Sequence, residues 1–227
     1  MLDTWLVSAY TGVPHPHDGQ ALAWVPPVEL PRWDLLAADK PIVSALRLPG
    51  DYVFTPPDAH GEQVLRGLAR LPRGALLRLR LPRLTDTEYE ELARKILPEA
   101  RSAGLRVVLD RNAAMVEQLG ADGWHATAQT LARDDFPIAS PPLRFASCHD
   151  LADLRRAHSL GFEAAVLGPV YATGTHPDRM PIGWHRFEDL AAVSGLPVYA
   201  IGGVGPTQRE EAFSHYAQGT AGISAYW

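Results

Sequence analysis

Short apolar runs alternate with segments of helical periodicity from Asp51 to the end of the chain. Several runs are almost continuously apolar, such as Arg106-Val-Val-Leu109 and Ala164-Ala-Val-Leu167. Strands covered on both faces have this pattern, which is typical of parallel sheets in α/β proteins. The pattern predicts strands at residues 51–55, 75–81, 105–109, 122–126, 143–147, 163–167, 197–202 and 220–224.

Helical segments separate these strands. They are predicted at residues 58–70, 85–103, 113–119, 150–160, 183–194 and 206–218, with a short, imperfect helix at 129–134. Thr85-Asp-Thr-Glu88 has the spacing of a capping box, which marks a helix start. Gly104, Gly161 and Gly195 each lie where a helix C-cap is expected.

Eight βα repeats close into a barrel more naturally than they build an open sheet. We therefore expect an α/β fold of the TIM (β/α)8 type over residues 49–227, with an open doubly wound sheet as the alternative. Only Ala225-Tyr-Trp227 follows the last strand, so the barrel lacks its eighth helix. Since large exposed apolar patches are unusual on monomers, we expect the N-terminal residues, a second copy of the chain in a homodimer, or both to cover that side.

Residues 1–48 have a different pattern. Strand-like pieces at 4–10 and 21–25 precede a short helical stretch at 38–46. This is too little to bury a core of its own, so the segment is predicted to be a small extension packed on the barrel or involved in pairing. His15, His17 and Asp18 fit a polar loop better than a metal site.

Composition and charge exclude several classes of protein. The net charge of −5 and the absence of a basic run give no support for nucleic acid as a partner. A single cysteine, Cys148, excludes a disulfide framework and a multi-cysteine metal site and fits a reducing compartment. There is no apolar run of roughly 20 residues to cross a membrane and no signal-peptide pattern at the N-terminus. We expect a cytoplasmic protein that binds a small molecule.

Two glycine-rich segments carry the candidate chemistry. In Val198-Tyr-Ala-Ile-Gly-Gly-Val-Gly-Pro-Thr207 a strand runs into Gly202 and Gly203 and then into a helix start, where backbone N–H groups can bind an anion. Barrels commonly bind phosphate at the loops after strands seven and eight, so Ile223 and Ser224 are predicted to complete the site. A turn that only relieves crowding is the alternative.

The loop after the sixth predicted strand supplies further polar groups at the same barrel edge. Thr173, Thr175 and His176 lie in it, and they are predicted to clamp a ligand. A plain surface loop is the alternative.

Five motifs, in order, resemble the thiamin phosphate synthase/TenI family. They are Ala121-Asp-Gly-Trp-His125, Ser147-Cys-His149, Gly168-Pro-Val-Tyr-Ala-Thr-Gly-Thr175, Pro197-Val-Tyr-Ala-Ile-Gly-Gly-Val204 and Ile223-Ser-Ala225. The likeness covers residues 51–227. It implies a barrel that binds a thiazole phosphate and, in synthases, joins it to a pyrimidine pyrophosphate.

The chain departs from the synthase pattern at charged positions. The family's Gln-x-Arg-x-Lys reads Arg78-Leu-Arg-Leu-Pro82, which keeps only Arg80. Its Asn-Asp reads Leu109-Asp110, and the lysine after Thr-x-Thr is His176. The position of a second magnesium-binding carboxylate falls at Thr130. Because magnesium needs oxygen ligands and pyrophosphate needs cations, we expect no metal site and no cofactor, with magnesium used only by residual synthase activity.

TenI-type members of the family need neither magnesium nor pyrophosphate. Their characterised type is a thiazole tautomerase, and its catalytic histidine matches His149. A histidine suits proton transfer because its unperturbed pKa lies near 6.5. A role for His149 in capping the next helix or in structural packing is the alternative. His125 and Ser147 join the predicted substrate-binding residues Arg78, Arg80, Asp110, Thr173, Thr175 and His176. For His125, which follows Trp124, a structural or stacking role is the alternative.

A TenI-like isomerase is thus the leading prediction. Residual magnesium-dependent thiamin phosphate synthase and a non-catalytic domain that senses a phosphate ligand are the alternatives. The extension adds a resemblance of its own: Asp18-Gly-Gln-Ala-Leu-Ala-Trp-Val25, Glu29-Leu30 and residues 38–46 are similar to the C-terminal half of a MutT-type Nudix hydrolase. The Nudix box does not occur in the sequence, so Nudix hydrolysis is not expected.

Overall fold

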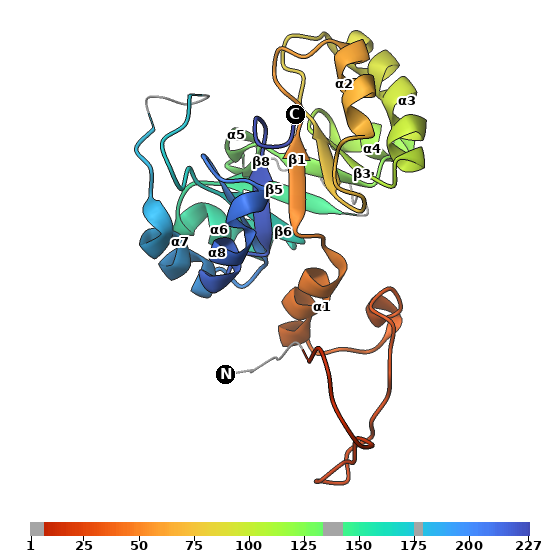
Figure 1. Cartoon of the computed structure of the whole chain (residues 1–227), viewed down its shortest axis with the longest axis vertical. Helices are drawn as coiled ribbons and strands as arrows, with labels where there is room; N and C mark the ends of the chain where they lie inside the picture. Colours follow the sequence, from red (N-terminus) through yellow and green to blue (C-terminus); the bar gives the residue numbers. More distant parts are fainter. Residues whose placement is uncertain (1–6, 134–142, 175–178) are drawn as a thin grey trace.

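The core of the protein is a closed barrel of eight parallel strands. The computed structural model describes residues 7–133, 143–174 and 179–227, and Figure 1 shows the barrel with the N-terminal extension at one end. Neighbouring strands pair in sequence order, and β1 also pairs with β8 through Tyr52 and Ala221, which closes the ring. The expected barrel is confirmed over the alternative open sheet. The strands are β1 (Asp51–Phe54), β2 (Leu76–Leu79), β3 (Arg106–Leu109), β4 (Gly123–Ala126), β5 (Arg144–Cys148), β6 (Ala164–Leu167), β7 (Val198–Ile201) and β8 (Gly219–Gly222).

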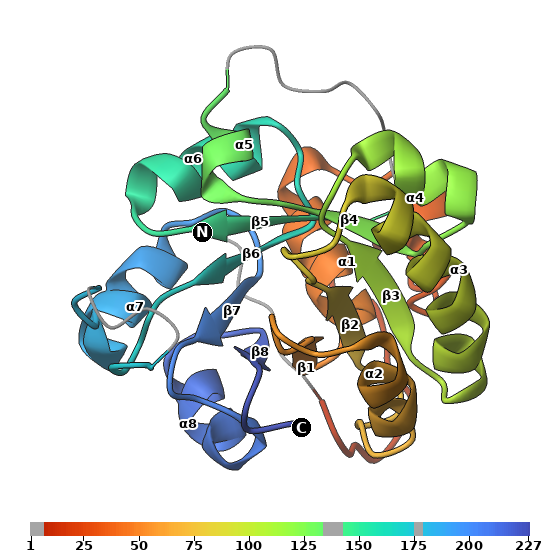
Figure 2. The same cartoon turned by 90° about the horizontal axis from the view of Figure 1, so that it is seen from above.

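A helix follows each strand from β1 to β7, and Figure 2 shows these helices outside the ring of strands. Thr85 caps α3 as predicted, since its side chain accepts from the Glu88 N–H and Glu88 accepts from the Thr85 N–H. The helix before β8 is shorter than predicted, because the 3-10 turn η3 (Pro206–Gln208) precedes it. The helices are α2 (Gly61–Leu68), α3 (Asp86–Ser102), α4 (Ala113–Leu119), α5 (Ala128–Leu131), α6 (Leu151–Ser159), α7 (Gly183–Ala192) and α8 (Arg209–Ser214). Among the described residues, no helix is long and apolar enough to cross a membrane.

Strand side chains pack in two layers. Outward residues such as Val53 and Leu77 pack against the helices, whereas inward residues such as Tyr52 and Phe145 fill the barrel interior. Both layers exclude water, which explains why the strands are apolar almost throughout. The inward ring of Tyr52 also carries a hydroxyl into the barrel interior, where it hydrogen-bonds to His125.

The residues after β8 pack against the barrel. Those that the structure describes, 223–227, form no helix. The Trp227 ring packs on Gly67 of α2 and its Nε1 donates to the Phe54 carbonyl oxygen at 2.8 Å. The Tyr226 hydroxyl donates to Asp51 of β1 at 3.0 Å. Two C-terminal aromatic side chains thus reach the side that residues 1–48 or a second copy of the chain are predicted to cover, and that prediction stays untested.

Helix α1 (Lys40–Arg47) lies instead at the barrel end where the strands begin. The Gln218 amide donates to the carbonyl oxygens of Ala45 and Leu48, both at 3.0 Å. The helix predicted at 38–46 is thus present, preceded by the 3-10 turn η2 (Ala37–Asp39). The strands predicted at 4–10 and 21–25 are wrong in their described parts, where the extended pieces have no neighbouring strand to hydrogen-bond and lie exposed.

Candidate active site

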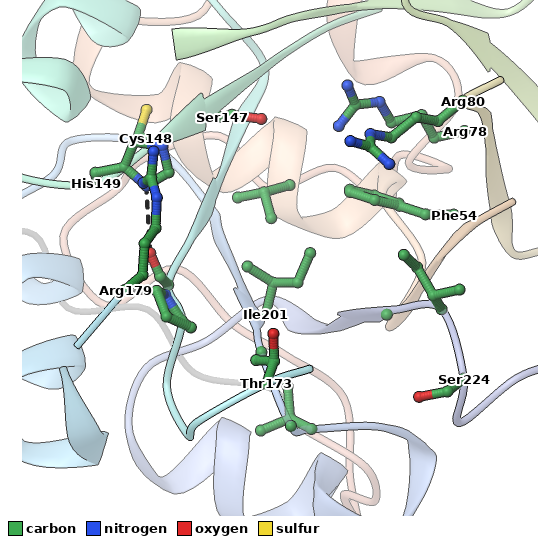
Figure 3. A pocket seen from close by; sticks show the side chains of 18 of the residues that line it. Phe54, Arg78, Arg80, Ser147, Cys148, His149, Thr173, Arg179, Ile201 and Ser224 are labelled. Atoms are coloured by element: carbon green, nitrogen blue, oxygen red, sulfur yellow. Dashed lines mark hydrogen bonds between the residues drawn. The ribbon is translucent and has the colours of Figure 1, made fainter. Parts of the chain in front are cut away.

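A cavity of about 820 Å³ opens at the C-terminal ends of the strands. Figure 3 shows it from close by, with side chains from both halves of the barrel turned towards it. The structure brings together most of the residues that the sequence singled out. Those that line the cavity are Arg78, Arg80, Ser147, His149, Thr173, Gly202, Gly203, Ile223 and Ser224. Thr175 and His176 lie outside the described residues.

One wall is backbone from the loop after β7. Gly202 and Gly203 have φ angles of +98° and +68°, which favour glycine. A Cβ at Gly202 would lie 2.5 Å from the Cβ of Pro169, and one at Gly203 would lie 2.7 Å from the Cβ of Tyr171. Within the described part of the chain the Gly203 N–H has no acceptor. A wall of bare backbone with a free N–H suits an anionic group such as a phosphate.

The loop after β6 is joined to this wall. The Val170 N–H donates to the Ile201 carbonyl oxygen at 2.8 Å, and the Tyr171 N–H donates to the Gly202 carbonyl oxygen at 2.9 Å. Thr173, further along the same loop, lines the cavity. The two loops therefore form one continuous rim of the cavity.

His149 lies between the end of β5 and the start of α6, on the cavity wall. Its Nδ1 is 3.3 Å from the Gly168 carbonyl oxygen. Because a carbonyl oxygen only accepts, this contact holds the proton on Nδ1 of the neutral ring and leaves Nε2 with a lone pair. The capping alternative does not describe this side chain, since the Asp150 side chain caps α6 by accepting from the Asp153 N–H.

Arg78 and Asp110 form an ion pair beneath the cavity. Their closest nitrogen and oxygen are 3.1 Å apart, and the side chains are 5% and 11% exposed. The Arg78 guanidinium also lies 4.8 Å from the centre of the Phe54 ring. Asp110 does not line the cavity, although it was predicted to contact the ligand. Arg80, two residues further along the chain, does line the cavity. Burial and the nearby Arg78 lower the pKa of Arg80.

His125 lies inside the barrel, behind the cavity wall. Its Nδ1 is 2.8 Å from the Tyr52 hydroxyl, and its Nε2 is 2.8 Å from the Ser147 hydroxyl. Burial, with a smaller effect from Arg78 and Arg80, holds the pKa of His125 well below its usual value. The imidazole is therefore neutral, and only Ser147 of this group reaches the cavity. Burial also raises the pKa of the Cys148 thiol, which disfavours the thiolate that a nucleophile needs.

Comparison with known proteins gives the cavity its context. The family model described as "Thiamine monophosphate synthase" matches residues 52–226. The chain belongs to this family. A thiamine-phosphate synthase from Laribacter hongkongensis is 30% identical over 176 residues, which is 71% of this chain and 80% of that protein. Another, from a Roseiflexus species, is 28% identical over 185 residues, 77% of this chain and 76% of that protein.

A solved structure shares the fold. Thiamine phosphate pyrophosphorylase from Pyrococcus furiosus superposes with a TM-score of 0.62 at 21% identity, over 83% of this chain and 88% of that one. The family match begins at residue 52, so the similarity of residues 1–48 to a Nudix hydrolase stays a prediction.

The residues that the structure describes do not fit the magnesium ion that a synthase of this family uses. Mg²⁺ requires an octahedral shell of oxygen ligands and is usually held by carboxylates and phosphates. Asp110 already faces a buried cation, and Thr130 has its hydroxyl 2.9 Å from that of Thr127. Across residues 7–133, 143–174 and 179–227, no three His, Cys, Asp or Glu side chains lie close enough to hold a metal ion.

Several lining residues were not found from the sequence. Arg179 reaches the cavity on the same side as His149 (Figure 3). The available signal was a cationic residue shortly after His176, which stands at the family's lysine position. Phe54 and Gln208 also line the cavity, from β1 and from η3. They carry no motif, because an aromatic residue in a strand and a glutamine in a turn are ordinary in any barrel.

Proposed function

We propose that the protein is a TenI-like member of the family that binds a thiazole phosphate and transfers a proton, as a thiazole tautomerase does. The observation that carries the proposal is the buried ion pair between Arg78 and Asp110. The pair engages Asp110, the one carboxylate that the chain retains at the family's magnesium positions. His149, by contrast, lines the cavity. The site is thus equipped for proton transfer and poorly equipped for the departure of a pyrophosphate.

Each residue has a defined part in this proposal. The backbone at Gly202 and Gly203 binds the phosphate together with the loop at Ile223 and Ser224. Nε2 of His149 removes a proton from the thiazole carboxylate phosphate and returns it at another ring position, which yields the aromatic tautomer. Histidine suits both steps because its usual pKa lies near the working pH. The Gly168 carbonyl oxygen keeps the ring in the required tautomer.

The direct test follows aromatisation of thiazole carboxylate phosphate by the wild type and by His149→Ala. We expect the variant to be slower by about 10²- to 10⁴-fold, the usual contribution of a general acid–base residue. His185→Ala is the matched control, since this histidine lies on the outer surface of α7 and is 95% exposed. Equal rates in the wild type and His149→Ala would remove His149 from the mechanism.

Thiamin phosphate synthase activity is the second candidate. The relatives from Laribacter and Roseiflexus are named thiamine-phosphate synthases, and Arg80 and Ser224 of the synthase pattern line the cavity. This function predicts magnesium-dependent product from the two phosphorylated precursors, and no product at high protein concentration would exclude it. Tight binding of the thiazole phosphate without turnover in either assay would instead indicate a ligand-sensing domain.

A further inference from the structure

Tyr52, His125 and Ser147 form a line of hydrogen-bonding groups from the barrel interior to the cavity. The two outer hydroxyls each lie 2.8 Å from one ring nitrogen of His125. Tyr52 and His125 are fully buried, and Ser147 is the member that lines the cavity (Figure 3). A neutral imidazole has one N–H and one lone pair, so the two bonds must run in the same direction along the line.

The direction follows from Tyr52. Burial keeps the pKa of its phenol well above the usual value, so the hydroxyl retains its proton and needs an acceptor. His125 Nδ1 is the acceptor within reach among the described residues. If Nδ1 carried the proton instead, the buried Tyr52 O–H would be left without an acceptor, which is rare in folded proteins. Tyr52 therefore donates to Nδ1, and the ring proton lies on Nε2.

Nε2–H then donates to the Ser147 oxygen. A serine hydroxyl has a single proton, and with its oxygen accepting from His125 that proton is free to point into the cavity. We propose that Tyr52 and His125 are positioning residues that hold Ser147 as a hydrogen-bond donor, and that this donor binds a carboxylate on the ligand. The inference rests on the proposed function, because it names the second anionic group of a ligand whose phosphate lies at the glycine wall.

The charges around Ser147 favour a carboxylate over a neutral acceptor. Arg78 and Arg80 both line the cavity and both act electrostatically on His125, immediately behind Ser147. Nε of Arg78 is buried without a partner in the described part of the chain. Figure 3 shows Ser147 and the two arginines towards one side of the view, with Thr173 and Ser224 towards the other. The cavity thus has an arginine–serine end and a glycine end, which matches a ligand with one anionic group at each end.

Calorimetry with two probes tests the carboxylate assignment. The probes are thiazole carboxylate phosphate and the thiazole phosphate that lacks the carboxylate, and the readout is the ratio of their Kd values. We expect the wild type to prefer the carboxylate probe, and Ser147→Ala to lose about tenfold of that preference, as for one hydrogen bond to a charged group. Ser147→Thr retains a hydroxyl and should restore most of it.

The positioning role has its own readout. In wild-type protein, ¹⁵N NMR of labelled histidine should show Nε2 protonated and Nδ1 bare for His125, whose signals are those lost in His125→Gln. Tyr52→Phe removes the donor to Nδ1, so a mixture of tautomers and a weaker carboxylate preference are expected. The matched control is Tyr199→Phe, an equally buried tyrosine whose hydroxyl donates to the Pro49 carbonyl oxygen at 2.6 Å, away from His125.

The outcomes separate the inference from the proposed function. Protonation of His125 at Nδ1 in the wild type, or an unchanged Kd ratio in Ser147→Ala, would overturn the inference even if His149→Ala still abolished aromatisation. Failure of both probes to bind the wild type would overturn both. A preference lost in Ser147→Ala and in Tyr52→Phe, but kept in Tyr199→Phe, would support the line of donors even in a protein without turnover.

Discussion

The Arg78 guanidinium and the Asp110 carboxylate are 3.1 Å apart and almost out of reach of solvent. In the synthase pattern the position of Arg78 holds a glutamine, which has no charge with which to neutralise a neighbouring carboxylate. The substitution therefore changes the role of Asp110 from a free ligand to one half of an internal pair. A divalent cation bound there would have to displace Arg78 and leave it buried beside another positive charge.

Breaking this pair is expected to lower stability. Arg78→Gln leaves Asp110 buried without its cation, so the free energy of unfolding should fall by about 3–5 kcal/mol. Urea unfolding measures the change. Arg78→Gln with Asp110→Asn removes both charges and should be less destabilising than the sum of the single variants. Arg83→Gln is the control, since its pair with Asp58 is exposed and contributes about 0–1 kcal/mol; an equal loss in both arginine variants would contradict the buried pair.

His125 should make stability depend on pH. Its folded-state pKa is held well below the usual value by burial, whereas in the unfolded chain it is about 6.5. Below pH 6.5 the unfolded state takes up a proton that the folded state does not, so stability falls as the pH falls. Between pH 7.5 and 5.5 the wild type should lose about 1.4 kcal/mol more than His125→Gln. Urea unfolding at the two pH values measures this, and an equal loss in the wild type and in His125→Gln would show that His125 is not held neutral.

At the residue scale, the sequence predicted which residues lie at the site better than it predicted the contacts of each side chain. The motifs placed His149, Ser147 and the glycines at strand ends, and the barrel brings all of them to one cavity. Motifs alone did not show that Asp110 bonds Arg78 or that His125 points inward. These depend on which face of a strand each side chain takes, and the strands are too uniformly apolar for the sequence to show it.

At the scale of elements, the sequence predicted the order of strands and helices in the barrel correctly. The strands could be recognised because both of their faces are covered, which makes them apolar almost throughout. The C-terminal segment was not anticipated as a cover. The three residues after the last predicted strand carry no periodicity, and nothing in their sequence shows that Tyr226 and Trp227 fold back over β1 and β8. The strands predicted in the extension did not form, because a strand-like segment is stable only when it pairs with a neighbouring strand.

Trp227 is therefore expected to contribute more to the free energy of unfolding than a residue at the end of a chain usually does. Its ring lies directly on α2, where a Cβ at Gly67 would be 2.2 Å from the ring. Trp227→Ala removes this packing and the bond to the Phe54 carbonyl oxygen, so the free energy of unfolding should drop by about 2–3 kcal/mol, somewhat less than for a fully buried tryptophan. Chemical denaturation provides the measurement. Trp24→Ala, at a position 77% exposed in the extension, should change stability by no more than about 0.5 kcal/mol.

At the scale of the whole molecule, the extension divides into a part that packs and a part that does not. Helix α1 is bonded to the start of β8 through Gln218, whereas most of residues 7–36 is exposed and extends away from the barrel (Figure 1). Large apolar side chains such as Val28 and Leu36 are exposed in this stretch. Surface of this kind usually contacts a partner, and the predicted homodimer is one way to cover it.

Two deletions distinguish these parts. Removing residues 2–36 should leave the thermal midpoint within a few degrees of the wild type and shift any self-association seen by light scattering towards monomer. Removing residues 2–48 also uncovers the barrel end beneath α1, so the midpoint should fall and aggregation should rise. A well-behaved barrel after the longer deletion would show that α1 is dispensable.

The central claim is that this barrel moves a proton on a thiazole phosphate without a divalent cation. The most direct measurement is ¹H NMR of thiazole carboxylate phosphate with the wild-type protein, in excess EDTA and again in excess magnesium. We predict aromatisation at the same rate in both. Failure to aromatise in either, together with release of pyrophosphate once magnesium and the pyrimidine pyrophosphate are added, would contradict it and identify the protein as a synthase.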